Sequence, residues 1–228
     1  MTIRQSLLNI AVNTALRRAD IIIFSMFLRN LYAPGEYYID RDSGILYFYP
    51  PDENENSKIM LSTSNENIIS ITEKASNITV DGLTLQGTRA DALNVAGENC
   101  KIVNCSVKNA ADCGINVSGK NNLVENCEVA FIGKDAVVLS GGSAEGFVYG
   151  SNTVTNNSLH DYGEIQKTYI AGVNLSGIGN VVSHNEIYNA PHMGVYYTGN
   201  ENVVEYNYIH DVVLQSSDAG AIYTGYSY

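Results

Sequence analysis

The stretches "CSVKNAADCGINVSG" (105–119), "CEVAFIGKDAVVLSG" (127–141) and "NEIYNAPHMGVYYTG" (185–199) decide the fold, because all three repeat one pattern. Each starts with Cys or Asn, has an aliphatic residue at its third position, and reaches Gly or Ala nine residues after its start. A short strand-like run follows. Along the chain the pattern starts at Cys105, Cys127, Asn157, Asn185 and Asn207, with separations of 22, 30, 28 and 22 residues.

This spacing predicts a solenoid. Short alternating strands that recur about every 22 residues, with Asn and Gly at the turns, are typical of stacked repeats. The segments between strands are too short for the crossover helices of a doubly wound α/β sheet. We therefore predict an all-β, right-handed, single-stranded parallel β-helix over residues 66–228, with equivalent residues about 4.8 Å apart in successive coils. The five starting residues should form one stacked column.

The rest of the chain fits no repeat. Residues 1–32 are expected to form a poorly defined N-terminal extension. Residues 33–65 begin with "APGEYYIDRDSGILYFYPP" (33–51), which predicts a β-hairpin with its turn at Asp42-Ser43-Gly44. No terminal cap is recognisable before Tyr228, so we expect the β-helix to be truncated at the C-terminus relative to a longer protein.

Composition and charge restrict the partners. The chain is 45% hydrophobic and 16% charged, as folded domains are, and its net charge is −11. An acidic surface without a Lys/Arg run disfavours nucleic acid and anionic membranes as partners. The longest apolar run, "IIIFSMFL" (21–28), is too short to cross a bilayer and is followed by no evident signal-peptide cleavage site. No pattern indicates the oligomeric state.

The cysteines carry no metal-binding spacing. Cys100, Cys105, Cys113 and Cys127 form no CxxC pair and have no His-rich partner segment, so no metal site is expected. Cys105 and Cys127 would be neighbours in the predicted column, close enough for a disulfide. Free thiols that pack as small apolar groups are the favoured alternative.

A candidate site emerges from the second shared position of the repeat. The Gly or Ala positions are Ala92, Gly114, Ala136, Gly172, Gly194 and Gly220. His192 and Asp218 stand two residues before the last two of these, so we predict them to be stacked neighbours on the solvent face of one sheet. A carboxylate beside an imidazole orients the ring and raises its pKa. The plainer interpretation is an exposed pair that contributes little energy.

Insertions surround this pair. The coil that starts at Asn157 has six extra residues and the coil that starts at Asn207 has four, whereas the coil between them has none. We therefore expect loops 161–170 and 211–218 to protrude on either side of His192 and to form a notch that suits a sugar. The residues predicted to bind substrate there are Tyr196, Tyr162, Tyr169, Asn174, Asp161 and Asp211. Asp161 and Asp211 are alternatively turn residues that bond their own backbone.

The segments "PHMG" (191–194) and "SDAGAIYTG" (217–225), together with the coils before them, resemble a known superfamily. Residues 30–228 resemble bacterial right-handed β-helix proteins of the pectate-lyase-like superfamily, most closely the fucosidase/xylanase-type β-helix glycoside hydrolases. The resemblance implies that acidic residues on the exposed sheet and nearby loops are catalytic. It thus favours Asp218, with Glu205 in "VVEYN" (203–207) and His192 beside it, and it implies a secreted or cell-surface location.

Three functions remain open. A glycoside hydrolase needs two carboxylates about 5–10 Å apart, with Asp218 as one and Glu205, Asp211 or Asp161 as the other. A polysaccharide lyase needs a base and cations. Residues 92–228 hold no Arg, five Lys and thirteen Asp or Glu, so an acidic substrate would require a bridging Ca²⁺. The charge therefore favours a neutral polysaccharide and no cofactor. A non-catalytic sugar-binding or adhesin-like solenoid is the third possibility.

Overall fold

The computed structural model of the chain describes residues 60–225 without a break and, before them, residues 2–4, 11–12, 34, 36–40 and 42–50. The chain divides into two compact units, Met1–Thr63 and Ser64–Tyr228. Most of the expected N-terminal extension, residues 1–32, lies outside the described residues. Within the described part of the chain, no helix is long and apolar enough to span a membrane.

The first unit contains a β-hairpin, in the stretch for which the sequence predicts one. Strands β3 (Tyr37–Asp40) and β4 (Ile45–Phe48) pair antiparallel, β1 (Thr2–Arg4) adds to β4, and β2 (Ala11–Val12) pairs with β5 (Leu61–Ser62). The Asp40 carboxylate accepts hydrogen bonds from the Ser43 hydroxyl at 2.5 Å and from the Asp42 N–H at 3.1 Å. These bonds fix the turn, and those from Ser43 lower the pKa of Asp40.

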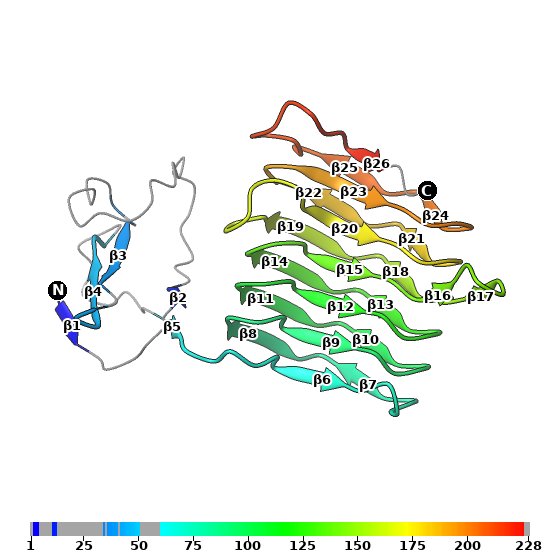
Figure 1. Ribbon diagram of the computed structural model, residues 1–228, viewed down its shortest axis with the longest axis horizontal. Coiled ribbons are helices and arrows are strands. Elements are labelled where there is room, and N and C mark those ends of the chain that lie inside the picture. Colours follow the sequence, from blue (N-terminus) through cyan, green and yellow to red (C-terminus); the bar gives the residue numbers. More distant parts are fainter. Residues whose placement is uncertain are drawn as a thin grey trace. The chain divides into compact units, whose positions relative to one another are not determined.

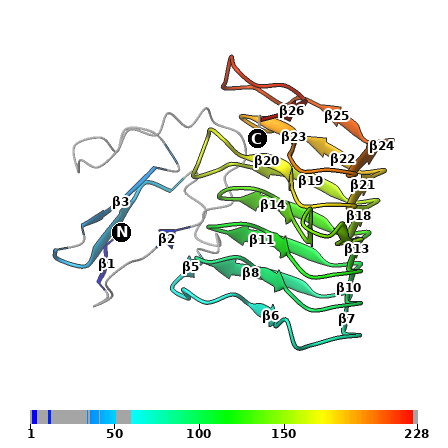
Figure 2. The same ribbon diagram turned by 45° about the vertical axis from the view of Figure 1, so that its right-hand side comes forward.

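The second unit is a stack of coils whose strands form three parallel sheets (Figures 1 and 2). The chain passes from sheet I to sheet II to sheet III and back to sheet I in every coil. Sheet I contains β6 (Ile69–Ile71), β9 (Leu93–Val95), β12 (Ile115–Val117), β15 (Val137–Leu139), β20 (Ala171–Leu175), β23 (Met193–Tyr197) and β26 (Ile222–Thr224). Sheet II contains β7 (Thr79–Asp81), β10 (Lys101–Val103), β13 (Leu123–Glu125), β18 (Thr153–Thr155), β21 (Val181–Ser183) and β24 (Val203–Glu205). Sheet III contains β8 (Thr84–Thr88), β11 (Ser106–Ala110), β14 (Glu128–Ile132), β19 (Ser158–Tyr162), β22 (Glu186–Tyr188) and β25 (Tyr208–His210).

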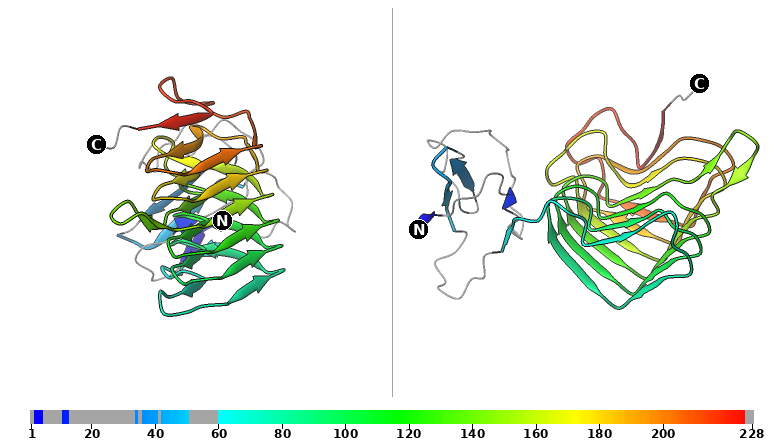
Figure 3. Two further views of the ribbon diagram at one scale, coloured as in Figure 1. Left: turned by 90° about the vertical axis from the view of Figure 1, so that its right-hand side faces the viewer. Right: turned by 60° about the horizontal axis from the view of Figure 1, so that its bottom comes forward.

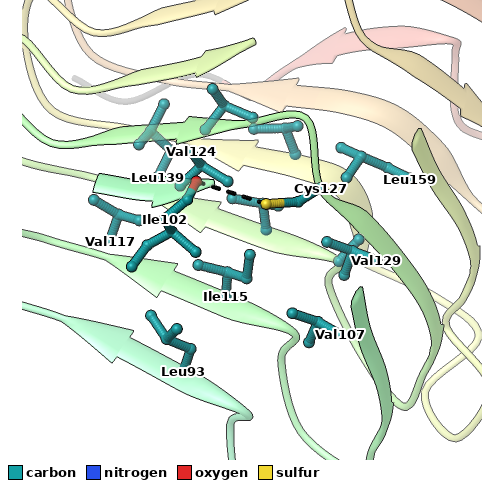
Figure 4. Close-up of a cluster of buried hydrophobic side chains, with 14 of the residues drawn as sticks. Leu93, Ile102, Val107, Ile115, Val117, Val124, Cys127, Val129, Leu139 and Leu159 are labelled. Atoms are coloured by element: carbon teal, nitrogen blue, oxygen red, sulfur yellow. Dashed lines mark hydrogen bonds between the residues drawn. The ribbon is translucent and has the colours of Figure 1, made fainter. Parts of the chain in front are cut away.

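This architecture confirms the predicted right-handed parallel β-helix. Its core consists of inward side chains from all three sheets, which stack coil upon coil (Figure 4). On sheet I the inward positions are in register, and the side chains of Leu93, Ile115, Val137, Val173 and Val195 are all 0% exposed. Each such side chain stabilises the fold by about 1.5–3 kcal/mol relative to exposure.

The predicted column of starting residues is confirmed, and hydrogen bonds explain its composition. The side-chain oxygen of each Asn accepts the backbone N–H of the residue one coil earlier: Asn157 accepts from Cys127 at 2.8 Å and Asn185 from Asn157 at 3.0 Å. The Asn157 side-chain amide donates to the Val124 carbonyl at 3.1 Å. The Cys127 thiol donates to the equivalent carbonyl, that of Ile102, at 3.6 Å. The cysteines are buried free thiols, as the favoured alternative predicted.

A second ladder of the same kind, which we did not predict, lies at the corner between sheets I and II. The Asn122 oxygen accepts the Cys100 N–H at 2.8 Å, and the same bond joins each later pair. Its members are Asn122, Asn152, Asn180 and Asn202, which have the same 30, 28 and 22-residue separations as the first ladder. Two columns of hydrogen-bonded side chains, buried except for the half-buried Asn202 and Asn207 of the last coils, therefore fix the register of the coils.

Candidate functional site

The notch predicted around His192 is not formed. His192 is 4% exposed rather than solvent-facing, because the insertion that follows β25 folds back onto the preceding coil. The Val213 N–H donates to the His192 carbonyl at 2.8 Å and the Gln215 N–H donates to the Pro191 carbonyl at 3.1 Å. The inserted loop thus covers the short coil instead of leaving it open. Within the described part of the chain, Nδ1 of His192 has no hydrogen-bond partner.

Asp218 is not the equivalent of His192. Val195 pairs with Ile222, so the position of Gly194 is taken in the next coil by Ala221 and not by Gly220. The predicted alignment was wrong by one residue, because the insertion in this coil is one residue longer than the sequence pattern suggested. Asp218 lies on the exposed loop, with its Oδ1 atom 3.5 Å from the Tyr223 hydroxyl.

The remaining predicted residues are distributed over different faces. Tyr162 is a core residue, 0% exposed, whose hydroxyl donates to the Met193 carbonyl at 2.7 Å, so it lines no surface site. Glu205 ends β24 on sheet II and is exposed there, on a different sheet from Tyr196. Asn174 and Tyr196 are neighbours on the outer face of sheet I. Tyr169, on the loop before β20, is 83% exposed, and its ring centroid lies 6.0 Å from that of His192, so these two predicted residues are brought together.

Asp161 and Asp211 lie at the end of sheet III. Both adopt a left-handed backbone, with φ of 51° and 49°, and so does Asn189 between them, with φ of 53°. This favours the turn interpretation. Their carboxylates also contact the preceding histidines: the distance from Nδ1 of His160 to Oδ2 of Asp161 is 2.6 Å, and the His210–Asp211 distance is 3.0 Å.

A group of carboxylates that the sequence interpretation passed over lies elsewhere on sheet I. Asp91, Asp112 and Asp135 stand where the chain passes from sheet III to β9, β12 and β15. Nζ of Lys134 is 2.8 Å from Oδ1 of Asp112. Ligand atoms of Asp91, Asp112 and Cys113 lie within 4.8 Å of one another. We call these five residues the carboxyl cluster.

Two of the carboxylates are fixed by the same local device. Oδ1 of Asp91 accepts the Cys113 N–H at 3.0 Å, and Oδ1 of Asp135 accepts the Ala171 N–H at 2.7 Å. Each also receives a side-chain bond from an Asn on the outer face of the next coil: Asn116 donates to Asp91 at 3.4 Å, and Asn174 bonds to Asp135. The carboxylates consequently orient amide groups on that face.

Burial gives one carboxyl group an unusual proton affinity. Asp135 is 8% exposed, and desolvation raises its pKa to about 6, although the hydrogen bonds from Ala171 and Asn174 act in the opposite direction. The hydrogen bond to Asp112 raises the pKa of Lys134, so this ammonium stays charged. Burial, and then the charge of Asp135, raises the pKa of the Cys113 thiol. Near neutral pH the cluster therefore combines a protonatable carboxyl group with a carboxylate–ammonium pair.

The loop 163–170 borders this cluster. The Gly163 N–H donates to the Lys134 carbonyl at 2.9 Å, and the N–H groups of Glu164 and Ile165 donate to the carbonyls of Ile132 and Gly133 at 2.9 and 3.0 Å. The insertion is therefore fastened to the coil that carries Lys134 and Asp135. Glu164 is half-buried there, which raises its pKa.

The cluster does not fit the Ca²⁺ that a lyase would require. In the described part of the chain, Asp91, Asp112 and Cys113 are the one group with three potential ligands close together. Calcium takes six to eight oxygen ligands. Here one of the three ligands is a thiol with a raised pKa, and Asp112 already bonds Lys134.

Comparisons with known proteins agree with the fold. The family model described as "Right handed beta helix region" matches residues 42–177 and 75–228. Pectate lyase Pel9A is similar in structure, with a TM-score of 0.51 and 15% identity over 66% of this chain and 42% of that chain. The complex of XylC with xylose has a TM-score of 0.44, with 14% identity over 57% of this chain and 29% of that one.

An alginate lyase from Paenibacillus sp. str. FPU-7 has a TM-score of 0.38, with 12% identity over 72% of this chain and 77% of that chain. None of the curated proteins that were compared matches the sequence. The chain spans less than half the length of Pel9A. At 15% identity the likeness to Pel9A shows a shared fold, and a closer relation to fucosidase/xylanase-type hydrolases remains a prediction.

Proposed function

Because the chain belongs to the right-handed β-helix family, we propose that it is a carbohydrate-active domain that hydrolyses a neutral polysaccharide on the outer face of sheet I. The observation that carries this proposal is the carboxyl cluster. It joins Asp135, whose pKa is about 6, to the ion pair of Asp112 and Lys134 at the border of one exposed sheet. Pel9A, a pectate lyase by name, shows that the fold accommodates polysaccharide chemistry.

The cluster has the two kinds of carboxyl group that glycoside hydrolysis requires. Asp135, protonated in part at neutral pH, donates a proton to the glycosidic oxygen as that bond breaks. Asp112, with Lys134 as its counter-ion, takes a proton from the attacking water. Alternatively it attacks the anomeric carbon as the glycosidic bond breaks, and water then hydrolyses the glycosyl–Asp112 ester while Asp135 takes back a proton from that water. The two roles are separated because one group is desolvated and the other is paired with a cation.

The outer face of sheet I offers polar and aromatic contacts for the sugar chain. Its outward column contains Asn94, Asn116, Val138, Asn174 and Tyr196 in successive coils. Two of these amides are held by Asp91 and Asp135. Fixed amides beside an aromatic ring match the alternating hydroxyl groups and apolar faces of a pyranose.

A polysaccharide lyase is the second candidate, favoured by Lys134, the cation within the cluster. Its raised pKa makes it a poor base near neutral pH, and the cluster lacks the oxygen ligands of a calcium site. Hydrolysis is therefore preferred. The assignment of Asp218 and Glu205 as catalytic groups remains a prediction, and turnover by Asp218→Asn tests it for Asp218.

The test is a panel of neutral and acidic polysaccharides incubated with the purified chain. Hydrolysis releases reducing ends without an unsaturated product, whereas a lyase gives the ultraviolet absorbance of an unsaturated uronate. We expect reducing ends from a neutral polymer, and their loss in Asp135→Asn. Binding without turnover of any polymer would identify a non-catalytic solenoid, and no binding at all would reject the proposed function.

A further inference from the structure

The hairpin of β16 (Gly142–Ser143) and β17 (Val148–Tyr149) lies at the C-terminal ends of the strands of sheet I, whereas the carboxyl cluster lies at their N-terminal ends. It is inserted directly after β15, where the strands of sheet I end. The loop 163–170 precedes β20, where these strands begin. Because β15 and β20 are paired neighbours, the two insertions flank one part of the sheet. Figure 3 shows the hairpin projecting beyond the coils.

The hairpin presents apolar side chains to solvent. Phe147 is 75% exposed, Val148 49% and Tyr149 44%. Phe147 also has a φ of 52°, a conformation that aromatic residues rarely adopt. Exposed aromatic residues on a projecting element are typical of a recognition surface rather than of a core.

Backbone contacts hold the Tyr149 ring in place. The Gly150 N–H donates to the Ile178 carbonyl and the Asn121 N–H to the Gly150 carbonyl, both at 2.8 Å, which fastens the base of the hairpin to two coils. A Cβ atom at Gly179 would lie 1.9 Å from Cδ1 of Tyr149 and 2.8 Å from both neighbouring ring carbons. These three distances place Gly179 at the edge of the ring and not over its face. The ring is thus fixed at its edge, and Gly179 covers neither face.

We propose that Tyr149, with Phe147, forms a sugar-binding subsite for a polysaccharide chain that extends across sheet I from the carboxyl cluster. This inference rests on the proposed function. The side chains of residues 136–166 include no Lys or Arg, and Glu145 is the one charged residue of the hairpin. A subsite without cations selects a neutral sugar, whose apolar face packs against an aromatic ring.

The distance along the strands from the carboxyl cluster to the hairpin determines how long a substrate must be to reach this subsite. A strand of five residues, such as β20, spans about 16 Å. The hairpin therefore contacts sugar units that lie several rings away from the bond being broken. Long chains gain affinity from it and short oligosaccharides do not.

The test compares Tyr149→Ala with Tyr149→Phe, with Val148→Ala as the matched control on the same hairpin. We expect Tyr149→Ala to raise KM for a neutral polymer about five-fold, with kcat unchanged, and Tyr149→Phe to behave as wild type. On short oligosaccharides all three variants should match wild type. Phe147→Ala, at the exposed tip, should also raise KM for the polymer without lowering the melting temperature.

Binding of the same polymer to Asp135→Asn separates the two proposals. If this variant, like wild type, binds no polymer, the proposed function fails. If it binds, and adding Tyr149→Ala and Phe147→Ala leaves the affinity unchanged, the subsite is wrong and the proposed function stands. A loss in Tyr149→Phe as large as in Tyr149→Ala would overturn the stacking contact, because only the hydroxyl group differs.

Discussion

Two places on sheet I carry similar insertions and differ in what those insertions do. At the carboxyl cluster, the loop after β19 is fastened to the backbone of residues 132–134, and the carboxylates beside it keep their polar partners. At the last coils, the loop after β25 is fastened to residues 190–192 and buries His192. Both loops therefore cover buried side chains, Asp135 at 8% exposed and His192 at 4%, and the difference is that Asp135 keeps hydrogen-bond partners whereas Nδ1 of His192 has none among the described residues.

The largest expected effect is a difference in kcat between variants of the carboxyl cluster and variants of the last coils. Asp135→Asn removes the proposed proton donor and should lower kcat by about 100-fold or more, the lower end for positioned acid–base catalysis. Asp218→Asn, on the exposed loop of the last coils, should leave kcat within about two-fold of wild type. Turnover of the preferred polymer by both variants measures this. The reverse result would return the catalytic role to Asp218.

The second effect concerns stability in the middle and at the end of the stack. Asn157 is 3% exposed and bonds the Cys127 N–H, the Val124 carbonyl and Asn185. Asn157→Ala leaves buried backbone groups without partners and should cost about 3 kcal/mol in the free energy of unfolding. Asn207→Ala, in a half-buried position of a later coil, should cost less. Urea unfolding of both variants measures these losses in unfolding free energy. Small and equal losses in the two variants would contradict a stabilising role of the ladder.

Much of the fold follows from the sequence, because one residue type recurs wherever its side chain has a fixed bonding role. The column from Cys105 to Asn207 is visible as a repeat since each Asn bonds the coil before it. The second ladder, from Asn122 to Asn202, has the same separations and was open to detection by the same count. The cysteines fit because a thiol donates to the same carbonyl position as the amide.

The site was less predictable for a physical reason. The length of an insertion is not fixed by any repeated residue, so the repeat could not be aligned reliably across it. Gly220 was aligned with Gly194, although the true equivalent is Ala221, and Asp218 was therefore misplaced by one residue. The path of a loop depends on backbone bonds such as that from Val213 to His192, which no residue type specifies. The carboxyl cluster did leave a signal: Asp precedes the strands in "RADALN" (89–94), "AADCGIN" (110–116) and "GKDAVV" (133–138).

The third effect is the pH dependence of the cluster. The pKa of Asp135 is about 6 in the folded chain, above the value of about 3.9 for an unfolded Asp. The folded state therefore binds more protons between these values, and the stability contributed at low pH is lost as pH rises from about 4 to about 6. The loss is of order 1–3 kcal/mol, and Asp135→Asn should remove it.

Activity should respond in the same direction, because the general acid must be protonated. We expect kcat/KM to fall as pH rises above about 6, since Asp135 then loses its proton. Thermal melting and turnover over this range measure the two effects in parallel. A melting temperature that rises steadily from pH 4 to pH 6, relative to Asp135→Asn, would contradict the raised pKa.

The smallest effect tests the other side of the comparison, at His192. The ring is 4% exposed and its Nδ1 atom has no partner among the described residues, so its role there is packing. His192→Ala leaves a cavity and should destabilise the fold by about 1–2 kcal/mol. His192→Leu refills much of that space and removes the unpaired nitrogen, so it should be at least as stable as wild type. Neither variant should change polymer turnover more than two-fold. If His192 instead bound sugar, His192→Leu would still keep its melting temperature but would lose polymer binding, and that result would show that the loop 211–218 opens in solution.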